Sequence, residues 1–265
     1  MLRGETRVRS CKHQTVAVGA VAASLLWLVL CLIPAATSTA SAQPQAQPSP
    51  QSSAQPSPQP SAQLSSVAGA DFDGCPVTGI GGDPALNTQK NRSATPPADL
   101  VPYTTTQLAQ LPPVDAAEGV TRSAWPASDQ SAVAGREQQA VVLTVYVVRA
   151  IAEGKEACNC DSLNPNDHDV HLYVGDIPDD TPANAAIVEV TPRWRAAYPS
   201  WNAQNLQKLA DSGTQVRITG WLMYDQEHWD MIAKHERATL WEVHPVTSIQ
   251  VETSQGWVDL ANYTP

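Results

Sequence analysis

Five segments of the chain are rich in β-branched and other apolar residues, and several alternate apolar with polar positions. Successive side chains of a strand point to opposite faces, so this pattern predicts strands with one buried face. A polar region between the third and fourth segments contains a predicted helix over residues 201–211, with Ser200 as its cap and Gly213 at its end. The predicted strands are residues 140–151, 170–174, 186–191, 214–224 and 237–251.

Three strands, a helix and two further strands are the order of elements in a small oligonucleotide- or oligosaccharide-binding (OB) barrel. We therefore expect a mainly β fold, a five-stranded OB-like barrel with a helix between strands three and four. Gly220 in the fourth strand and Pro245 in the fifth fit sharply coiled or bent positions. An open α+β sheet with the same order of elements is the alternative.

The N-terminal region has the pattern of an export signal. Basic residues precede an apolar run over residues 15–33, and small residues stand at positions 40–42. A retained membrane anchor is the alternative, because the run approaches the length that crosses a bilayer. We expect a secreted or extracytoplasmic protein that meets a membrane only through this segment, if the segment is not cleaved.

The composition changes along the chain divide it into five parts. A region of Pro, Gln, Ser and Ala has too few large apolar side chains to offset the entropy of ordering, so it is predicted to be a linker. The predicted parts are a signal peptide (1–42), a Pro/Gln/Ser-rich linker (43–70), an irregular pre-barrel segment (71–137), the barrel (138–257) and a tail (258–265).

The chain is acidic, and removal of the signal makes it more so. The first 42 residues contain four of the 16 Lys and Arg and one of the 26 Asp and Glu, which leaves 12 against 25, a net charge of about −13. Non-specific nucleic-acid binding depends mainly on Lys and Arg at phosphates, so this balance disfavours it.

Three cysteines lie outside the signal, namely Cys75, Cys158 and Cys160. Export places them in an oxidising compartment, where two of the three are expected to form a disulfide. A bridge from Cys75 to either of the others would close a long loop and stabilise the fold by ~4 kcal/mol in the chain-entropy model. A strained Cys158–Cys160 bridge and a zinc site are the alternatives.

Acidic and histidine residues recur at strand spacing and suggest a metal site. Asp167, Asp169 and His171 are two residues apart, so an extended chain would place them on one face. Neutral imidazoles and carboxylates suit zinc or another divalent ion, and three ligands with an open position would activate water. The complete tentative set is Asp167, Asp169, His171, Asp225, His228, Glu242 and His244.

The same residues also permit a purely structural interpretation. His244 can hydrogen-bond Glu242, the two aspartates before the second strand can cap backbone amides, and His235 belongs to a solvated loop. No established metalloprotease, EF-hand or zinc-finger spacing is present in these segments.

Aromatic residues suggest a ligand face. The chain has eight Trp and six Tyr but one Phe, and such side chains combine a flat face with a polar tip. Small barrels stack bases or sugars on such rings. The candidate binding residues are Trp221, Trp229, Tyr224, Arg217 and Arg237, whereas Trp201 on the helix is expected in the core.

Several pieces resemble exported bacterial proteins of unknown function that carry an OB-fold-like domain of the nucleic-acid-binding, tRNA/helicase type. These are DHDVHLYV, IVEV, VRITGWLMYDQEH and LWEVHPV within residues 140–251, and GCPVTGIGGDPALNTQKNR over residues 74–92. The resemblance implies the fold and export, with a loose suggestion of nucleic-acid binding, and it implies no reaction.

Three functions follow as hypotheses. The first is an exported, monomeric binding module for an extracytoplasmic oligosaccharide or oligonucleotide. The second is a metal-dependent hydrolase of phosphodiesters or glycans that uses the acid and histidine set. The third is a structural module of the envelope.

Overall fold

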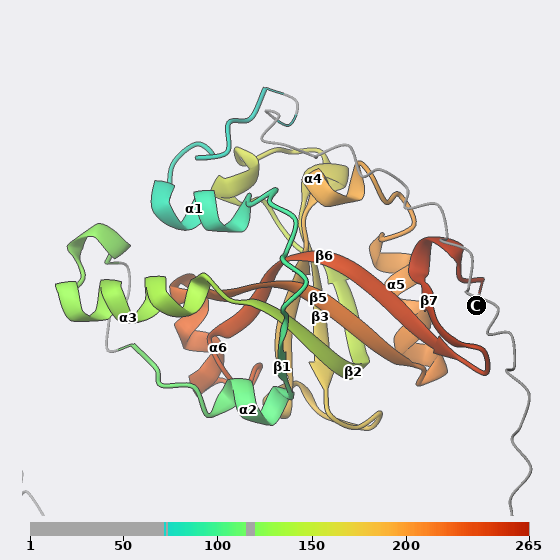
Figure 1. Cartoon of the computed structure of the whole chain (residues 1–265). Helices are drawn as coiled ribbons and strands as arrows, with labels where there is room; N and C mark the ends of the chain where they lie inside the picture. The colour runs from blue at the N-terminus through green and yellow to red at the C-terminus, as the bar shows by residue number, and fades with distance from the viewer. Residues whose placement is uncertain (1–71, 73, 115–119, 265) are drawn as a thin grey trace, which may run out of the picture. The chain divides into compact units, whose positions relative to one another are not determined.

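The computed structural model describes residue 72 and residues 74–114 and 120–264 (Figure 1). All of them belong to the unit Gln59–Pro265. The predicted signal peptide and linker lie outside the described residues. Within the part of the chain described, no helix combines the length and apolar character needed to cross a membrane.

Five strands close into a mixed barrel. In order around the barrel, β2 pairs with β3, β3 with β4, β4 with β6, β6 with β5, and β5 with β2, and all of these pairs except β4 with β6 are antiparallel. The predicted OB-like barrel is confirmed, and the open sheet is wrong because β5 returns to pair with β2. The barrel strands are β2 (Ala140–Ala152), β3 (Val170–Gly175), β4 (Ala186–Val190), β5 (Gln215–Tyr224) and β6 (Trp241–Thr253).

The barrel interior is built from alternate strand positions. In β5 the even-numbered residues from Val216 to Leu222 are buried, while the odd-numbered ones are partly exposed. Inward-facing positions of the other strands complete one apolar core, to which β2, β3, β4 and β6 contribute Val141, Leu143, Val145, Leu172, Val174, Val188, Val243, Ile249 and Val251.

Two helices lie between β4 and β5, α4 (Pro192–Arg195) and α5 (Ala203–Ser212). The helix expected after Ser200 is therefore confirmed, although it begins slightly later. The backbone amide of Asn205 donates to Asn202 Oδ1 over 3.0 Å, so Asn202 is the cap in place of Ser200. Gly213 ends α5 with a φ of 60°.

The region before the barrel is more regular than its composition suggested. It contains the helices α1 (Pro84–Lys90), α2 (Thr105–Ala109) and α3 (Ala127–Glu137), and the strand β1 (Val101–Tyr103), which pairs in parallel with β2. The prediction of an irregular segment over residues 71–137 is wrong in this respect, because short capped helices leave little hydrophobic periodicity in the sequence. Besides α4, two other elements were not expected, namely α6 (Trp229–Ala233) and β7 (Gly256–Asp259), which extends β6 as a hairpin.

The predicted disulfide joins Cys75 to Cys160 and leaves Cys158 as a buried free thiol. It ties the start of the described chain to the loop between β2 and β3. Helix α1 packs against β6 and against the short 3-10 helix Ala157–Asn159 in that loop. The pre-barrel segment therefore covers the outer face of the barrel next to β6 (Figure 1).

Gly220 occupies the position where the register of β5 against β6 shifts. A Cβ there would lie 2.4 Å from the carbonyl oxygen of Pro245 and 2.5 Å from a methyl carbon of Val243. The two strands can approach this closely only because residue 220 has no side chain.

We expect Gly220→Ala to lower the free energy of unfolding by about 1–3 kcal/mol, because backbone atoms must move to admit the new methyl group. Urea unfolding followed by circular dichroism measures the change. Gly135→Ala is the matched control, since open space surrounds this helical glycine and alanine there should stabilise α3 by about 0.5–1 kcal/mol. Equal effects of the two substitutions would contradict the close approach.

Candidate metal centre

Three neighbouring strands bring His171, Glu189 and His244 into one row. His171 of β3 pairs directly with Glu189 of β4. The parallel pairing of Val188 with Val243 sets Glu189 beside His244 of β6. The residues on either side of His171 and of Glu189, and the one before His244, belong to the apolar core, so the row lies on the outer face of the barrel.

The polar atoms of this row lie within the range of ion pairs. Glu189 Oε1 is 2.9 Å from His171 Nε2, and Glu189 Oε2 is 3.1 Å from His244 Nδ1. Asp169, which immediately precedes β3, has Oδ2 3.6 Å from His244 Nε2. All four side chains are 0–4% exposed. An ion with bonds of about 2.0–2.1 Å separates its ligand atoms by roughly 3 Å, which is close to these distances.

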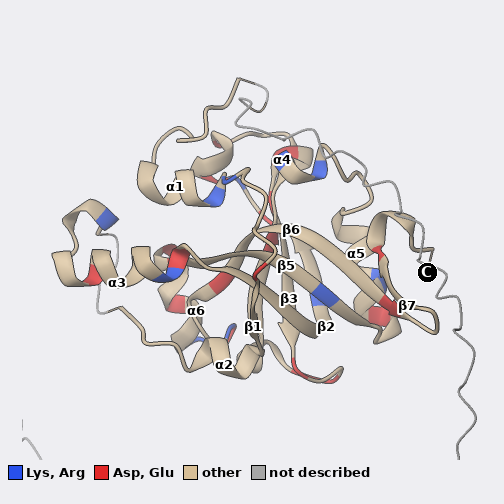
Figure 2. Cartoon of the chain, in the orientation of Figure 1, with Lys and Arg blue, Asp and Glu red and all other residues tan. Residues whose placement is uncertain are grey.

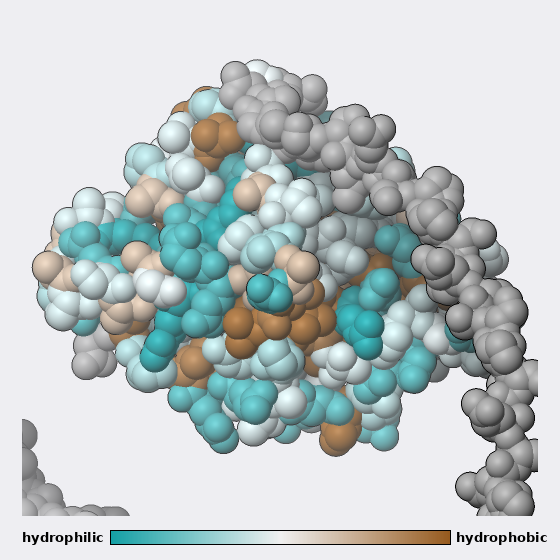
Figure 3. Space-filling view, in the orientation of Figure 1, coloured by the Kyte–Doolittle hydropathy of each residue, from teal (hydrophilic) through white to brown (hydrophobic). Residues whose placement is uncertain are grey.

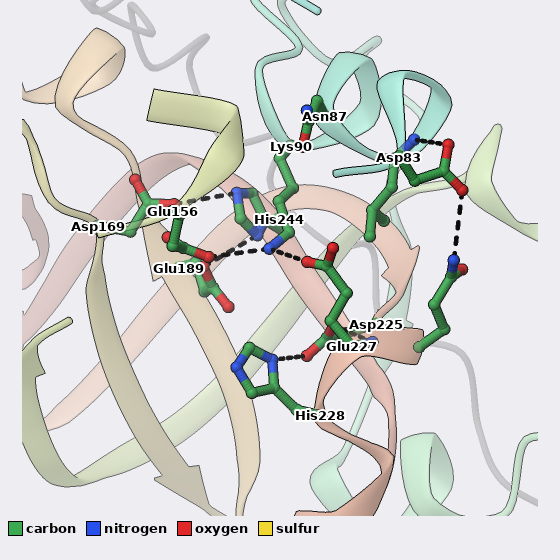
Figure 4. Close-up of polar contacts among 12 residues, drawn as sticks. Asp83, Asn87, Lys90, Glu156, Asp169, Glu189, Asp225, Glu227, His228 and His244 are labelled. Atoms are coloured by element: carbon green, nitrogen blue, oxygen red, sulfur yellow. Dashed lines mark hydrogen bonds and ion pairs between the residues drawn. The ribbon is translucent and has the colours of Figure 1, made fainter. Parts of the chain in front are cut away.

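The loop after β2 and helix α1 cover the row (Figure 4). Lys90 Nζ at the end of α1 is 2.9 Å from Glu156 Oε1 and 3.1 Å from Glu227 Oε2. Asn159 Nδ2 donates to Asp169 Oδ1 over 3.0 Å. Figure 2 shows acidic residues along the strands that pass below α1. The cover therefore contributes one ammonium group and a further carboxylate to an already acidic face.

Many buried atoms of this cluster have no aligned hydrogen bond. Of the ten buried side-chain polar atoms without such a partner among the described residues, seven are here. Five of them have an oppositely charged atom nearby: both oxygens of Glu189 lie close to the two histidines, and Asp169 Oδ2 lies 3.6 Å from His244 Nε2. Buried polar atoms are nearly always satisfied, so this concentration sets the cluster apart from the rest of the described protein. The seven atoms are Glu156 Oε2, Asn159 Oδ1, Asp169 Oδ2, His171 Nε2, both carboxylate oxygens of Glu189, and His244 Nε2.

Each histidine of the row also contacts a second carboxylate. His171 Nδ1 lies 3.0 Å from Glu153 Oε1, and His244 Nδ1 lies 3.2 Å from Glu242 Oε1. Histidines that bind metals usually donate their other ring N–H to a carboxylate or carbonyl, which fixes the orientation of the ring. Glu153 gives His171 such support, whereas His244 Nδ1 faces both Glu189 and Glu242.

The carboxylates of the cluster stabilise positive charge on the neighbouring side chains. Burial lowers the pKa of His244, but Glu189 and Glu242 outweigh it and raise this pKa to about 10. Burial also lowers the pKa of His171, but Glu189 and Glu153 outweigh it and raise this pKa well above its usual value. Burial, with Glu156 and Glu189 nearby, raises the pKa of Asp169 well above its usual value. The carboxylates therefore require either protons on the histidines or a cation in their place.

A second group, around Asp225, borders the row. Asp225 Oδ2 is 2.6 Å from His228 Nδ1 and 2.8 Å from an Nη1 of Arg237. The other guanidinium nitrogen of Arg237 is 2.9 Å from Glu242 Oε2. Arg237 is fully buried and neutralises the carboxylates of Asp225 and Glu242. This group is therefore a satisfied ion-pair network, and it fixes the position of the Glu242 side chain.

The structure separates the predicted metal ligands into three sets. It brings Asp169, His171 and His244 together, as the strand spacing suggested. It uses Asp225, His228 and Glu242 as neighbours of the cluster. It places Asp167 elsewhere, because this residue ends a 3-10 helix and accepts from Ser162 Oγ over 2.7 Å and from Asn164. Asp167 as a ligand is therefore wrong, and its hydrogen bonds are with these two side chains rather than with the backbone amides that we expected it to cap.

Sequence reasoning missed Glu189, Glu153 and Glu156. A carboxylate in the middle of the apolar strand AIVEV was the available signal for Glu189, because such a residue needs a partner when the strand is buried on both faces. Glu153 and Glu156 lie in the loop after β2, where an acidic residue is unremarkable.

The five predicted ligand-binding residues do not share an exposed surface. Tyr224 and Arg237 are buried, because the first points into the core and the second pairs with Asp225. The ring of Trp221 lies under the guanidinium of Arg92 at 4.6 Å, and its indole N–H donates to the carbonyl of Ala94. Arg217 lies over Trp257 at 4.2 Å. Trp229 is 40% exposed.

Apolar surface also lies next to Arg217, which lines a hollow together with Pro102, Tyr103 and Val142. Figure 3 shows an apolar area over β1 and β2 within a mostly hydrophilic face. Val101 of β1 is exposed there. The aromatic stacking face that we expected is therefore wrong for Tyr224 and Arg237. Trp201 is fully buried in the core, as expected.

The geometry defines a class of protein, a closed five-stranded barrel with a buried carboxylate and imidazole cluster on its outer face. Comparison of the chain with protein-family models, with curated proteins and with solved structures finds no match. The resemblance to exported bacterial proteins with an OB-like domain stays a prediction.

His228 gives the site a pH dependence. Its hydrogen bond to Asp225, together with the charge of that carboxylate, raises the pKa of His228 to about 9. A raised pKa in the folded protein means that the charged histidine stabilises the fold fully below its unfolded pKa of about 6.5. This contribution is lost as the pH rises through 9.

We expect the stability difference between the wild type and His228→Gln to be largest at pH 6 and to shrink toward pH 9.5, since glutamine cannot carry the charge. Urea unfolding across this range measures it. His235→Asn, in an exposed turn, is the control and should show no comparable trend. A constant difference for His228→Gln would contradict the ion pair.

Proposed function

We propose that this protein is an exported metal-binding barrel that holds a divalent transition-metal ion through Asp169, Glu189 and His244. The observation that carries the proposal is the set of fully buried ligand atoms on these three side chains that face one another without aligned hydrogen bonds. Figure 4 displays their convergence below α1. His171 lies beside Glu189 and supplies a further ligand.

The donor set points to the kind of ion. Two imidazoles and several carboxylates suit zinc or a neighbouring transition ion better than calcium or magnesium, which prefer oxygen ligands alone. A divalent ion would also neutralise carboxylates that otherwise hold both histidines in their charged form. The ion would therefore replace protons, and its binding releases them.

The disulfide supports the exported location. Structural disulfides persist in oxidising compartments, and the Cys75–Cys160 bridge holds the loop that contributes Glu156. Secretion and cleavage of the N-terminal segment are predictions in line with this bridge.

We expect mature protein, stripped with a chelator and dialysed against zinc, to retain at least one ion per chain by plasma mass spectrometry. Binding to the folded state alone should raise the unfolding free energy by about 2.7 kcal/mol at a free ion concentration of 100 times Kd. Glu189→Gln should lose both the ion and the stabilisation, because glutamine is a neutral and poorer ligand.

Glu252→Gln is the matched control, an exposed carboxylate on the same strand as His244, and it should bind like the wild type. Circular dichroism checks that each variant is folded, and His171→Gln at the margin of the cluster provides a second ligand variant. Failure of folded wild type to retain zinc, cobalt or manganese above the level of the control buffer would falsify the proposal.

Metal-dependent hydrolysis is a second candidate, favoured by the partly open side of the cluster. The side chains of Glu153, Glu156, Glu227 and His228 are between 15% and 38% exposed. The ring of His228 lies 6.1 Å from that of His171, and its raised pKa keeps it charged near neutral pH, so a proton donor stands near the proposed ion. Cleavage of an activated phosphodiester by zinc-loaded wild type, and its loss in His228→Gln with zinc retained, tests this function.

Binding of an oligosaccharide or oligonucleotide and a structural role in the envelope stay predictions. Both were expected from the fold and its aromatic content. Of the five residues expected at the ligand face, Trp229 is the one whose exposed ring supports such binding. The ion remains the ligand for which the buried atoms provide direct support.

A further inference from the structure

The potential ligands form three overlapping groups. Each group has three side chains whose donor atoms lie within 4.8 Å of one another. The groups are Glu156 with Cys158 and Asp169, Glu156 with His171 and Glu189, and Asp169 with Glu189 and His244. Each carboxylate belongs to two groups, and each group has one ligand of its own, a thiol or an imidazole. Shared carboxylates with separate terminal ligands are the arrangement that a pair of bridged ions requires.

We propose, building on the metal function above, that the cluster holds two ions and that Cys158 is a ligand of the second. The first ion lies with Asp169, Glu189 and His244. The second lies with Glu156, Cys158 and Asp169, and the Asp169 carboxylate bridges the two. As the sulfur–metal bond forms, the thiol gives its proton to solvent, and no electron is transferred.

One oxygen of each of these two carboxylates accepts a hydrogen bond from a neighbouring side chain, and the other accepts none. Lys90 Nζ donates a hydrogen bond to Glu156 Oε1, and Glu156 Oε2 is buried without a hydrogen bond. Asn159 Nδ2 donates a hydrogen bond to Asp169 Oδ1, and Asp169 Oδ2 is buried without a hydrogen bond. Glu156 and Asp169 each offer a carboxylate oxygen within 4.8 Å of the Cys158 sulfur and of each other.

The position of Cys158 is fixed from both sides. Its carbonyl accepts from Asn91 Nδ2 over 2.8 Å, and two residues later Cys160 is bridged to Cys75. The thiol is 1% exposed. The disulfide occupies the other two cysteines outside the predicted signal, so Cys158 stays reduced and available to a metal in an oxidising compartment.

A thiolate next to carboxylates selects a particular class of ion. Zinc and cadmium bind sulfur and oxygen together, whereas calcium and magnesium do not bind thiolates in proteins. The competing interpretation is a buried thiol that only fills space, as free cysteines often do. In that case Cys158 would be indifferent to metal, which an experiment can decide.

The full mature chain is stripped, loaded with zinc, freed of excess ion and analysed by plasma mass spectrometry. We expect two ions per chain in the wild type and one in Cys158→Ser, while Glu252→Gln retains two. Loading with cadmium should produce the ultraviolet charge-transfer band of a cadmium thiolate in the wild type, and this band should be absent in Cys158→Ser.

The outcomes separate this inference from the function on which it rests. One ion per chain and no thiolate band in the wild type overturn the second position but leave the metal function standing. Two ions retained by Cys158→Ser overturn the role of the sulfur. No ion in the wild type overturns both. The cadmium spectrum of the wild type decides the role of the thiol even if the serine variant does not fold.

Discussion

The structure depends on a row of charged side chains buried on the outer face of the barrel. Burial of an unpaired charge costs several kcal/mol, so a strand that carries Glu189 or His244 on this face is stable only when other charges and a cover are supplied. The row links β3, β4 and β6 through their register. It also explains why the barrel carries additional chain before its first strand.

The cover is the segment that precedes the barrel, and it combines apolar contacts with the core, through Leu108, Trp125 and Val133, with buried polar contacts. Lys90 on α1 donates a hydrogen bond to Glu156, and Arg122 donates two hydrogen bonds of 2.7 Å each to Glu137. The Cys75–Cys160 disulfide joins this segment to the β2–β3 loop. Loss of the bridge would release the pre-barrel segment from the β2–β3 loop. Both of these segments cover the charged row, so the disulfide stabilises the part of the fold that buries it.

The site combines side chains from paired strands with side chains from a loop. His171, Glu189 and His244 stand on paired strands, whose hydrogen bonds hold their spacing. Glu156 and Cys158 stand in a loop held by Lys90, Asn91 and the disulfide. The paired strands and the tied loop therefore both hold the side chains of the proposed site in place.

The sequence by itself determined the barrel, because apolar and polar residues that alternate along a strand indicate which side of it is buried. Gly220 also marked the position where two strands approach each other. It also identified Asp169, His171 and His244, whose spacing survives in extended chain. Only the tertiary structure decided that Glu189, Glu156 and Cys158 join them, that Asp167 does not, and that Tyr224 and Arg237 are buried. Partners across strands and loops depend on register and closure, which arise from long-range packing and leave no local pattern in the chain.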